Sequence, residues 1–248
     1  MISISIVSHG HAALLERLLT DLARLPAAVP LELILTFNID EPPPQNLGLL
    51  QMPLRLIHNA QPKGFAANHN AAFAVAQGRW FCVLNPDIAL PHDPFPHLLQ
   101  QMQQHGAALA APAVLSPAGE LEDSVRCFPT LGGLLRKGRG QHDGRYAFAV
   151  GDAPFEADWV AGMFMLFASE AYRAVGGFDE AFHLYYEDVD ICVRLWRSGH
   201  KVLACPAVQV LHEAQRSSRR NLRFMGWHAS SLLRFFFKHG LQLRSLRA

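Results

Sequence analysis

The chain has 248 residues, of which half are hydrophobic and 17% are charged, so it can bury a full core of its own. Its formal net charge of +1 argues against bulk electrostatic binding to nucleic acid, which depends on many phosphate contacts from excess Lys and Arg. One α/β domain is the default architecture, because such folds reach about 250 residues as one unit.

The cysteines and the N-terminal segment predict a cytoplasmic protein. The first segment, residues 1–7, lacks a basic n-region and has serine at every second position, which favours a strand over a signal peptide. No uncharged apolar run approaches the roughly 20 residues that cross a bilayer, so we expect a soluble protein or one bound at a membrane surface. The four cysteines lack metal or redox spacing and predict free thiols in a reducing cytosol. They are Cys82, Cys127, Cys192 and Cys205.

The first half of the chain alternates predicted strands with predicted helices. Apolar residues alternate with serine over Ile2–Val7, which indicates a strand, and leucines at helical spacing predict a helix over Ala12–Leu25. This rhythm continues and predicts a mostly parallel sheet covered by helices, with ligands at the carboxyl ends of its strands. The further predicted elements are strands at 31–37, 54–57 and 80–84 and a helix at 66–77.

The second half begins with a segment, residues 116–154, that is rich in Gly, Pro and charge. This composition predicts a long surface loop or an acceptor-side insertion. After it we expect a short helix over Ser169–Val175, capped by Ser169, and an amphipathic helix over Asp188–Ser198, ended by Gly199. The other predicted elements are strands at 159–167 and 201–205 and a final helix at 221–238.

A predicted buried strand runs into a polar turn at Phe81–Asp87, and the last residue of that turn is a carboxylate. A hard divalent cation such as Mg²⁺ fills its shell from one or two carboxylates, substrate phosphates and waters. Asp87, at the carboxyl end of the strand, is therefore a candidate metal ligand. Taken alone, Asn85-Pro86-Asp87 is more often simply a turn.

A second group of carboxylates stands among aromatic residues at Tyr185–Asp190. Aromatic side chains favour burial, which argues against a solvated charged face. On a helix that begins near Glu187, Asp190 and Arg194 are spaced i,i+4 and can pair. That pairing leaves Glu187 or Asp188 free to face a cleft as a base. The alternative is an acidic helix N-terminus stabilised by the helix dipole.

A third candidate is His212, which an apolar strand at Val208–Leu211 delivers at its end. A lone histidine in such a place is more often a structural hydrogen-bonding residue than a ligand. Its neutral imidazole could nevertheless complete a metal site with Asp87.

Taken in order, these segments resemble the family-two glycosyltransferases of the GT-A fold, most closely their bacterial rhamnosyltransferase-like branch. The resemblance covers nearly the whole chain and rests on the joint order and spacing of the segments. It implies an α/β fold with a Rossmann-like, mostly parallel central sheet flanked by helices, and a C-terminal helical tail. The segments are Ile2–Val7, Asn59–Asn70, Leu84–Asp87, Trp159–Gly162, Gly176–Glu180, Tyr186–Asp190 and His212.

The resemblance also implies a role for each matching residue. Asp87 would hold a divalent metal, Mg²⁺ or Mn²⁺, that bridges the two phosphates of the donor, and His212 would reach the same metal. Asp188 would be the catalytic base, with Glu187 beside it. The nucleotide-sugar residues would be Ser8, His9, Asn38, Asp40, Lys63, Gly64, Asn70 and Asn85, and the acceptor-side residues Trp159 and Gly162.

One departure from the family pattern follows the second predicted strand. Where the family has Asp-Asn-x-Ser, whose Asp contacts the nucleobase, this chain reads Thr36–Asp40. Phe37 cannot accept a hydrogen bond from the base, so either Asn38 or Asp40 takes that role or base recognition is looser.

The activity implied by the resemblance is inverting transfer of a sugar, with rhamnose as one candidate, from a nucleoside-diphosphate donor. The acceptor would be a hydroxyl of a glycan or a lipid-linked molecule in cell-surface polysaccharide synthesis. Residues 1–215 would form the GT-A domain, with a nucleotide-sugar half at 1–115 and an acceptor-binding and catalytic half at 116–215.

Two other classes of protein compete with this reading. One is a non-catalytic nucleotide-sugar-binding protein of the same fold. The other is a nucleotidyltransferase, which is expected to have a Gly-rich, basic loop after the first strand. Here Val7–His11 has one glycine and no Lys or Arg, which argues against it.

Residues 216–248 form a predicted basic, amphipathic helical tail with eight Lys and Arg and no Asp or Glu. One interpretation is contact with an anionic membrane, where lipid-linked acceptors reside. That contact would place a cytoplasmic protein on the inner face of the cytoplasmic membrane. The other is a terminal helix packed on the domain or on the second subunit of a homodimer.

Overall fold

The computed structural model describes residues 1–26, 28–130, 132–133, 144–213 and 222–240. A nine-stranded sheet runs through them in the order β3-β2-β1-β4-β10-β6-β11-β5, with β8 paired to β11. Its strands are β1 (Ile2–Ser8), β2 (Leu31–Phe37), β3 (Leu54–His58), β4 (Trp80–Leu84), β5 (Ile88–Ala89), β6 (Ala107–Leu115), β8 (Phe155–Glu156), β10 (Phe164–Ala168) and β11 (Lys201–His212). A second, two-stranded sheet pairs β7 (Val125–Arg126) with β9 (Trp159–Val160).

The large sheet is mostly parallel. β1 pairs in parallel with β2 and β4, β2 with β3, and β6 with β11. β10 inserts between β4 and β6 and is antiparallel to both. The carboxyl ends of β1, β2, β4, β6 and β11 therefore share one edge, where ligands of open α/β sheets bind. This confirms the predicted fold class.

The two predicted halves of the domain share this sheet. β10 and β11 come from the half predicted at 116–215, and they flank β6 from the half predicted at 1–115. The halves are therefore not separate structural units, and their division of function stays a prediction.

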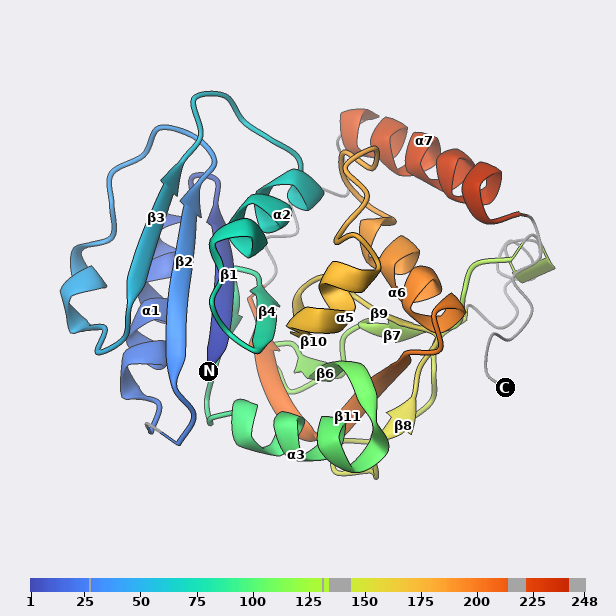
Figure 1. Ribbon diagram of the computed structural model, residues 1–248, viewed down its shortest axis with the longest axis horizontal. Coiled ribbons are helices and arrows are strands. Elements are labelled where there is room, and N and C mark those ends of the chain that lie inside the picture. The colour runs from blue at the N-terminus through green and yellow to red at the C-terminus, as the bar shows by residue number, and fades with distance from the viewer. Residues whose placement is uncertain (27, 131, 134–143, 214–221, 241–248) are drawn as a thin grey trace.

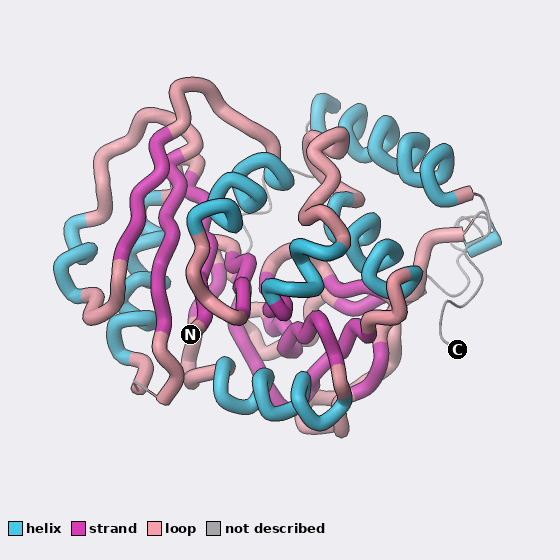
Figure 2. Tube along the Cα trace, viewed as in Figure 1, coloured by secondary structure: helices cyan, strands magenta, loops and turns pink. Residues whose placement is uncertain are grey.

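Helices cover both faces of the sheet (Figure 1, Figure 2). α1 (Ala12–Arg24) and α3 (Phe95–His105) bury their apolar stripes against one face. α2 (Phe65–Val75), α5 (Ser169–Ala174) and α6 (Glu187–Arg197) pack on the other. The chain also forms a short 3₁₀ helix, η1 (Gln45–Leu49). This two-sided cover explains why most strands are apolar at nearly every position rather than at alternate ones.

α7 (Leu222–His239) lies beside α6 (Figure 1). Its Phe235 and Phe236 are buried in the same core cluster as α6, whereas Leu233 and Phe237 are 72% and 95% exposed. This helix therefore packs on the domain, which is one of the two interpretations of the tail. Among the described residues, no helix combines the length and apolarity that a bilayer crossing requires.

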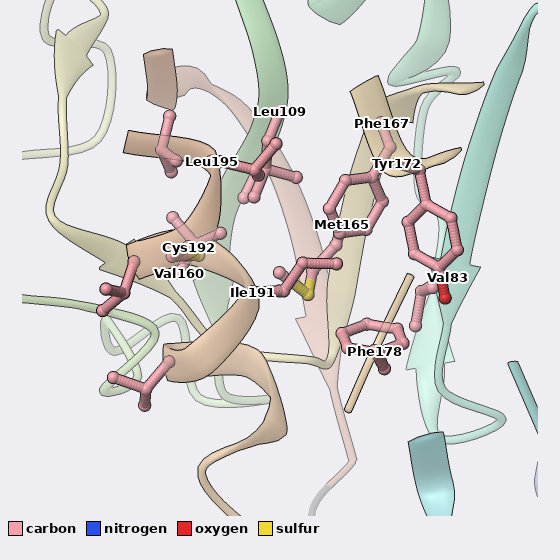
Figure 3. Close-up of a cluster of buried hydrophobic side chains, with 14 of the residues drawn as sticks. Val83, Leu109, Val160, Met165, Phe167, Tyr172, Phe178, Ile191, Cys192 and Leu195 are labelled. Atoms are coloured by element: carbon pink, nitrogen blue, oxygen red, sulfur yellow. The ribbon is translucent and has the colours of Figure 1, made fainter. Parts of the chain in front are cut away.

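The core between α5, α6 and the sheet fixes the position of α6. Ile191 of α6 is fully buried and lies near Met165 of β10 and Phe178 (Figure 3). Tyr172 of α5 stacks edge-on against Phe167 and Phe178, with ring centroids 5.1 and 5.5 Å apart. Edge-to-face aromatic pairs stabilise a core beyond what the burial of their apolar area contributes. The start of α6 therefore packs on a dense apolar layer.

The predicted buried strand at 159–167 is interrupted. β9 ends at Val160, β10 begins at Phe164, and residues 161–163 between them are not strand. The predicted cap of the following helix is wrong. Ala168 holds the N-cap position, and the hydroxyl of Ser169 instead donates to the carbonyl of Gly78 at 2.7 Å.

Truncation of Ile191 should destabilise the domain. We expect Ile191→Ala to lower the free energy of unfolding by about 2–5 kcal/mol, because Ile191 is 0% exposed and its truncation leaves a cavity in the core. Urea unfolding followed by circular dichroism measures the change. Leu233→Ala, on an exposed helix face, is the matched control and should change stability by less than about 0.5 kcal/mol. Equal losses in the two variants would contradict this packing.

Candidate functional site

Asp87 and His212 meet at the carboxyl edge of the sheet. Asp87 lies in the turn after β4, and His212 is the last residue of β11. His212 Nε2 lies 3.1 Å from Asp87 Oδ2, and the backbone N–H of Glu213 donates to the Asp87 carbonyl at 2.8 Å. The fold thus brings together the two residues predicted as metal ligands.

Glu122 is the third member of this cluster, and sequence reasoning did not find it. His212 Nδ1 donates to Glu122 Oε2 at 2.6 Å. Burial alone would lower the pKa of His212, but the hydrogen bonds and negative charges of Asp87 and Glu122 outweigh it and raise the pKa to about 9. The Asp87 and Glu122 carboxylates therefore favour the protonated form of the His212 imidazole.

The cluster suits a hard divalent cation that takes its other ligands from phosphates and water. Asp87 Oδ1 is buried and has no hydrogen-bond partner, which leaves one carboxylate oxygen available. Adjacent ligands of an ion at about 2.1 Å lie about 3 Å apart, close to the spacing of His212 Nε2 and Asp87 Oδ2. Within the described ranges, no group of three or more His, Cys, Asp or Glu side chains is placed to hold a metal by itself.

Asp188 lies in the first turn of α6, directly after a turn with an unusual backbone. Tyr185 and Tyr186 have φ values of 71° and 70°, a left-handed region that bulky residues rarely adopt. Asp188 Oδ2 accepts a hydrogen bond from the backbone N–H of Gly162 at 3.1 Å, and its Oδ1 accepts that of Val189 at 2.8 Å. Strained backbone of this kind is concentrated at functional sites.

Burial raises the pKa of both acids at the start of α6. It raises the pKa of Asp188 to about 6, although hydrogen bonds from the backbone of Gly162 and Val189 oppose the rise. Burial and the adjacent charge of Asp188 raise the pKa of Glu187. Glu187 is 5% exposed, whereas Asp188 is partly accessible. Asp188 is therefore the better placed of the two as a general base.

Asp190, the third acid of the segment, has a structural role. Its Oδ2 accepts a hydrogen bond from Arg194 Nε at 2.8 Å, which confirms the predicted i,i+4 pair. Its Oδ1 lies 2.7 Å from His239 Nε2 and 2.6 Å from Lys238 Nζ. Burial would raise the pKa of Asp190, but the hydrogen bond from His239 and the nearby cations outweigh it and lower the pKa. Asp190 thus fastens α7 to α6.

The segment between β9 and β10, residues 161–163, contacts both Asp188 and the turn that carries Asp87. Gly162 holds Asp188 through its N–H, and the carbonyl of the next residue, Met163, accepts the N–H of Asn85 at 3.0 Å. Asn85 begins the turn that carries Asp87. The candidate base and the candidate metal ligand therefore attach to adjacent residues of one backbone segment.

A network of amide side chains lies at the carboxyl end of β2. Asn38 Oδ1 accepts hydrogen bonds from the Lys63 backbone N–H and from Asn59 Nδ2, both at 2.8 Å. Asn38 Nδ2 donates to the Lys63 carbonyl at 3.0 Å and to His9 Nδ1 at 3.2 Å. Asn59 also donates to Asn68 Oδ1 at 2.6 Å. These contacts place Lys63 beside the ends of β1 and β2.

Two further predicted donor residues, Ser8 and Asp40, lie at the carboxyl ends of β1 and β2. Ser8 ends β1 and its hydroxyl is buried without a hydrogen-bond partner. Asp40 is exposed in the turn after β2. Phe37, the departure from the family pattern, is buried and stacks on His58 with ring centroids 4.9 Å apart. Of the two alternatives for base recognition, Asn38 is the one that belongs to the network.

Other predicted residues make contacts that shape the site. A Cβ on Gly64 would lie 2.7 Å from the His183 carbonyl oxygen, so only glycine fits where α2 begins against the loop before α6. The amide of Asn70 binds the backbone N–H and carbonyl of Phe178, at 3.0 and 2.9 Å. The indole of Trp159 donates to the Cys127 carbonyl at 3.0 Å. The donor and acceptor roles of these residues stay predictions.

Solved structures with a similar fold are glycosyltransferases. GalNAc-T7 with UDP, GalNAc and Mn²⁺ superposes with a TM-score of 0.69 at 16% identity, over 89% of this chain and 44% of that one. Mannosyltransferase PcManGT from Pyrobaculum calidifontis with GDP-Man and Mn²⁺ gives 0.66 at 15% identity, over 98% of this chain and 65% of that one. These likenesses show that the fold is GT-A. The chain spans less than two thirds of either structure's length.

The family follows from the sequence. The model of glycosyl transferase family 2 matches residues 3–146, more than half of the chain, and the chain belongs to that family. A second family model, described as the N-terminal domain of galactosyltransferase, matches residues 146–216. The predicted family is therefore confirmed, and the chain is a glycosyltransferase.

Curated relatives agree with the rhamnosyltransferase-like branch. Rhamnosyltransferase WbbL of Escherichia coli K12 is 28% identical over 252 residues, which cover 95% of this chain and 92% of that protein. N-acetylglucosaminyl-diphospho-decaprenol L-rhamnosyltransferase of Mycobacterium tuberculosis is 30% identical over 151 residues, which cover 57% of this chain and 49% of that protein.

The amide network gives a prediction for Asn38. Asn38→Ala should lower the free energy of unfolding by about 1–3 kcal/mol, because it removes the side-chain partner of the Lys63 N–H. It should also weaken binding of nucleoside diphosphates, measured by calorimetry. Asp40→Ala, in the exposed turn, is the control and should leave stability within about 0.5 kcal/mol of the parent. Weaker nucleotide binding in Asp40→Ala alone would assign base recognition to Asp40 instead.

Proposed function

We propose that this chain is a metal-dependent, inverting glycosyltransferase that uses a nucleoside-diphosphate sugar. The observation that carries the proposal is the shared attachment of Asp188 and the Asp87 turn to Gly162 and Met163. A single displacement at an anomeric carbon requires a base and a leaving-group stabiliser at one site. Attachment to adjacent backbone residues holds Asp188 and the Asp87 turn in such an arrangement. In such a displacement the base takes the proton of the incoming hydroxyl, and a cation held by Asp87 and His212 would supply charge neutralisation at the departing diphosphate.

The residues of this chain supply the positions of the reacting groups. Asp188 removes the proton from the acceptor hydroxyl as that oxygen attacks from the face opposite the diphosphate, so the configuration inverts. Two backbone N–H groups fix the orientation of its carboxylate. Asp87 and His212 would hold Mg²⁺ or Mn²⁺, which supplies charge neutralisation at the leaving diphosphate when bound. The Mn²⁺ in both solved neighbours supports this cofactor.

The names of the relatives support a donor and a class of acceptor. Two of them are rhamnosyltransferases, and the mycobacterial one acts on a diphospho-decaprenol, a lipid-linked molecule. We therefore propose transfer of rhamnose to a hydroxyl of a glycan or lipid-linked acceptor in cell-surface polysaccharide synthesis. Trp159 and Gly162 lie on the acceptor side in this proposal. A cytoplasmic protein at the inner face of the cytoplasmic membrane would meet such an acceptor.

Replacing the candidate base should separate binding from transfer. Asp188→Asn keeps an oxygen that can accept the Gly162 hydrogen bond but removes the basic group. We expect a loss of sugar transfer of about 100-fold or more, with nucleoside-diphosphate affinity largely unchanged. Transfer is measured as release of nucleoside diphosphate from a panel of nucleotide sugars, and affinity by calorimetry.

The pH dependence of transfer gives a second test of Asp188 as the base. Because the base must be ionised, and burial raises the pKa of Asp188 to about 6, transfer by the parent enzyme should rise with pH through about 6 and level off above it. Loss of nucleotide binding in Asp188→Asn would place this residue in the nucleotide pocket. A parent protein that binds donor without any transfer would favour the non-catalytic sugar-binding class.

The outer face of α7 supports membrane contact as part of this function. Leu233 and Phe237 are spaced i,i+4 and are 72% and 95% exposed, and Arg234 beside them is also exposed. Exposed aromatic and aliphatic residues beside basic ones suit the headgroup region of an anionic bilayer. The tail residues at 216–221 and 241–248 of the predicted basic segment lie outside the described residues.

Removing this apolar face should reduce binding to membranes without unfolding the helix. Leu233→Gln/Phe237→Gln should lower co-sedimentation with anionic vesicles about tenfold or more, since each buried side chain contributes about 1.5–3 kcal/mol. Leu49→Gln, which replaces an exposed apolar residue of η1 outside α7, is the control and should bind as the parent does. If the parent does not sediment with vesicles and the double variant turns a dimer into a monomer, the face is a subunit contact.

A further inference from the structure

Glu122 occupies a fixed place beside the candidate metal ligands. It follows a tight turn after β6, where the Ser116 N–H donates to the Glu120 carbonyl at 2.8 Å. The Glu122 N–H donates to the Val114 carbonyl at 2.8 Å, and Leu121 bridges to Leu115. The backbone of Glu122 is thus pinned against the last residues of β6, the strand next to β11.

The side chain of Glu122 sets the orientation of the His212 ring. It accepts from Nδ1 at 2.6 Å, while Nε2 on the opposite side of the ring faces Asp87 at 3.1 Å. All three side chains are largely shielded, with exposures of 13% for His212, 21% for Asp87 and 22% for Glu122. A carboxylate that holds Nδ1–H leaves Nε2 as the nitrogen that can release its proton to bind a cation.

This arrangement matches the outer partner of a metal-binding histidine. Such histidines generally donate their second N–H to a carboxylate, which fixes the ring and makes the ligating nitrogen more basic. A purely structural role would require only that Glu122 anchor the end of β11 to the loop after β6. The two roles differ in whether loss of the carboxylate charge changes cation affinity.

We propose that Glu122 is a positioning residue for the cation site, holding the His212 ring so that Nε2 and Asp87 bind one divalent ion. The inference rests on the proposed function, because it concerns the metal of that reaction. Glu122 does not contact the ion or the sugar donor in this role. It acts through His212 alone.

The test measures Mn²⁺ binding directly rather than activity. Electron paramagnetic resonance titrates free Mn²⁺ against the full chain, first alone and then with inorganic pyrophosphate, which stands for the diphosphate of a donor. We expect Glu122→Ala to weaken Mn²⁺ binding about 10–100-fold. Glu122→Gln, which still accepts from Nδ1 but lacks the charge, should lie between Glu122→Ala and the parent. Glu120→Gln, an exposed acid in the same turn, is the matched control and should bind as the parent does.

The outcomes separate this role from the proposed function. Mn²⁺ affinities of Glu122→Ala and Glu122→Gln equal to the parent's would overturn the positioning role and leave metal dependence standing. A parent chain that binds no Mn²⁺ with or without pyrophosphate would overturn metal dependence and this role together. If Glu122→Ala unfolds at a lower temperature, the comparison rests on Glu122→Gln, whose unchanged affinity would equally overturn the proposal.

Discussion

The hydrogen bond from the Gly162 N–H to Asp188 is the contact on which the candidate site depends. Residues 161–163 connect β9 of the two-stranded sheet to β10 of the large sheet and are not strand, so the Gly162 N–H lies outside the strand pairing and donates to α6. The next residue holds the turn after β4. Both residues directly precede β10, which lies between β4 and β6 at the centre of the sheet, where the backbone is least free to move.

Most of the fold could be predicted because its apolar patterns are strong. Strands at 31–37 and 80–84 have the predicted bounds, α1 ends one residue earlier than predicted, and α6 is shifted by one residue at each end. α3 and β6 gave no clear signal. β6 reads Ala107–Leu115 with five alanines and a proline, residues with low preference for strands, and it is a strand because both neighbours and both faces bury it.

The candidate site was partly predictable for a similar reason. Asp87, Asp188 and His212 follow recognisable strands or open a helix, so their chain positions alone indicated a shared edge. Glu122 carries no such signal, and Asn59 and Asn68 were indicated only as members of the segment Asn59–Asn70. Glu122 lies in a loop that composition marks only as irregular, and it reaches His212 because the turn after β6 folds back on that strand. Such contacts arise from tertiary packing, which no local pattern encodes.

The left-handed pair Tyr185–Tyr186 ties the placement of the base to the far end of the chain. Tyr186 packs on Phe235 and His228 of α7 with ring centroids 5.5 and 5.3 Å away, and the Leu184 carbonyl accepts the hydroxyl of Ser231 at 2.9 Å. Undocking of α7 would release a backbone conformation that costs about 1–3 kcal/mol per residue to maintain. A partner that binds the outer face of α7 and favours its docked state would therefore also stabilise the position of Asp188. By linkage, a ligand that favours this position of Asp188 would strengthen binding of that partner.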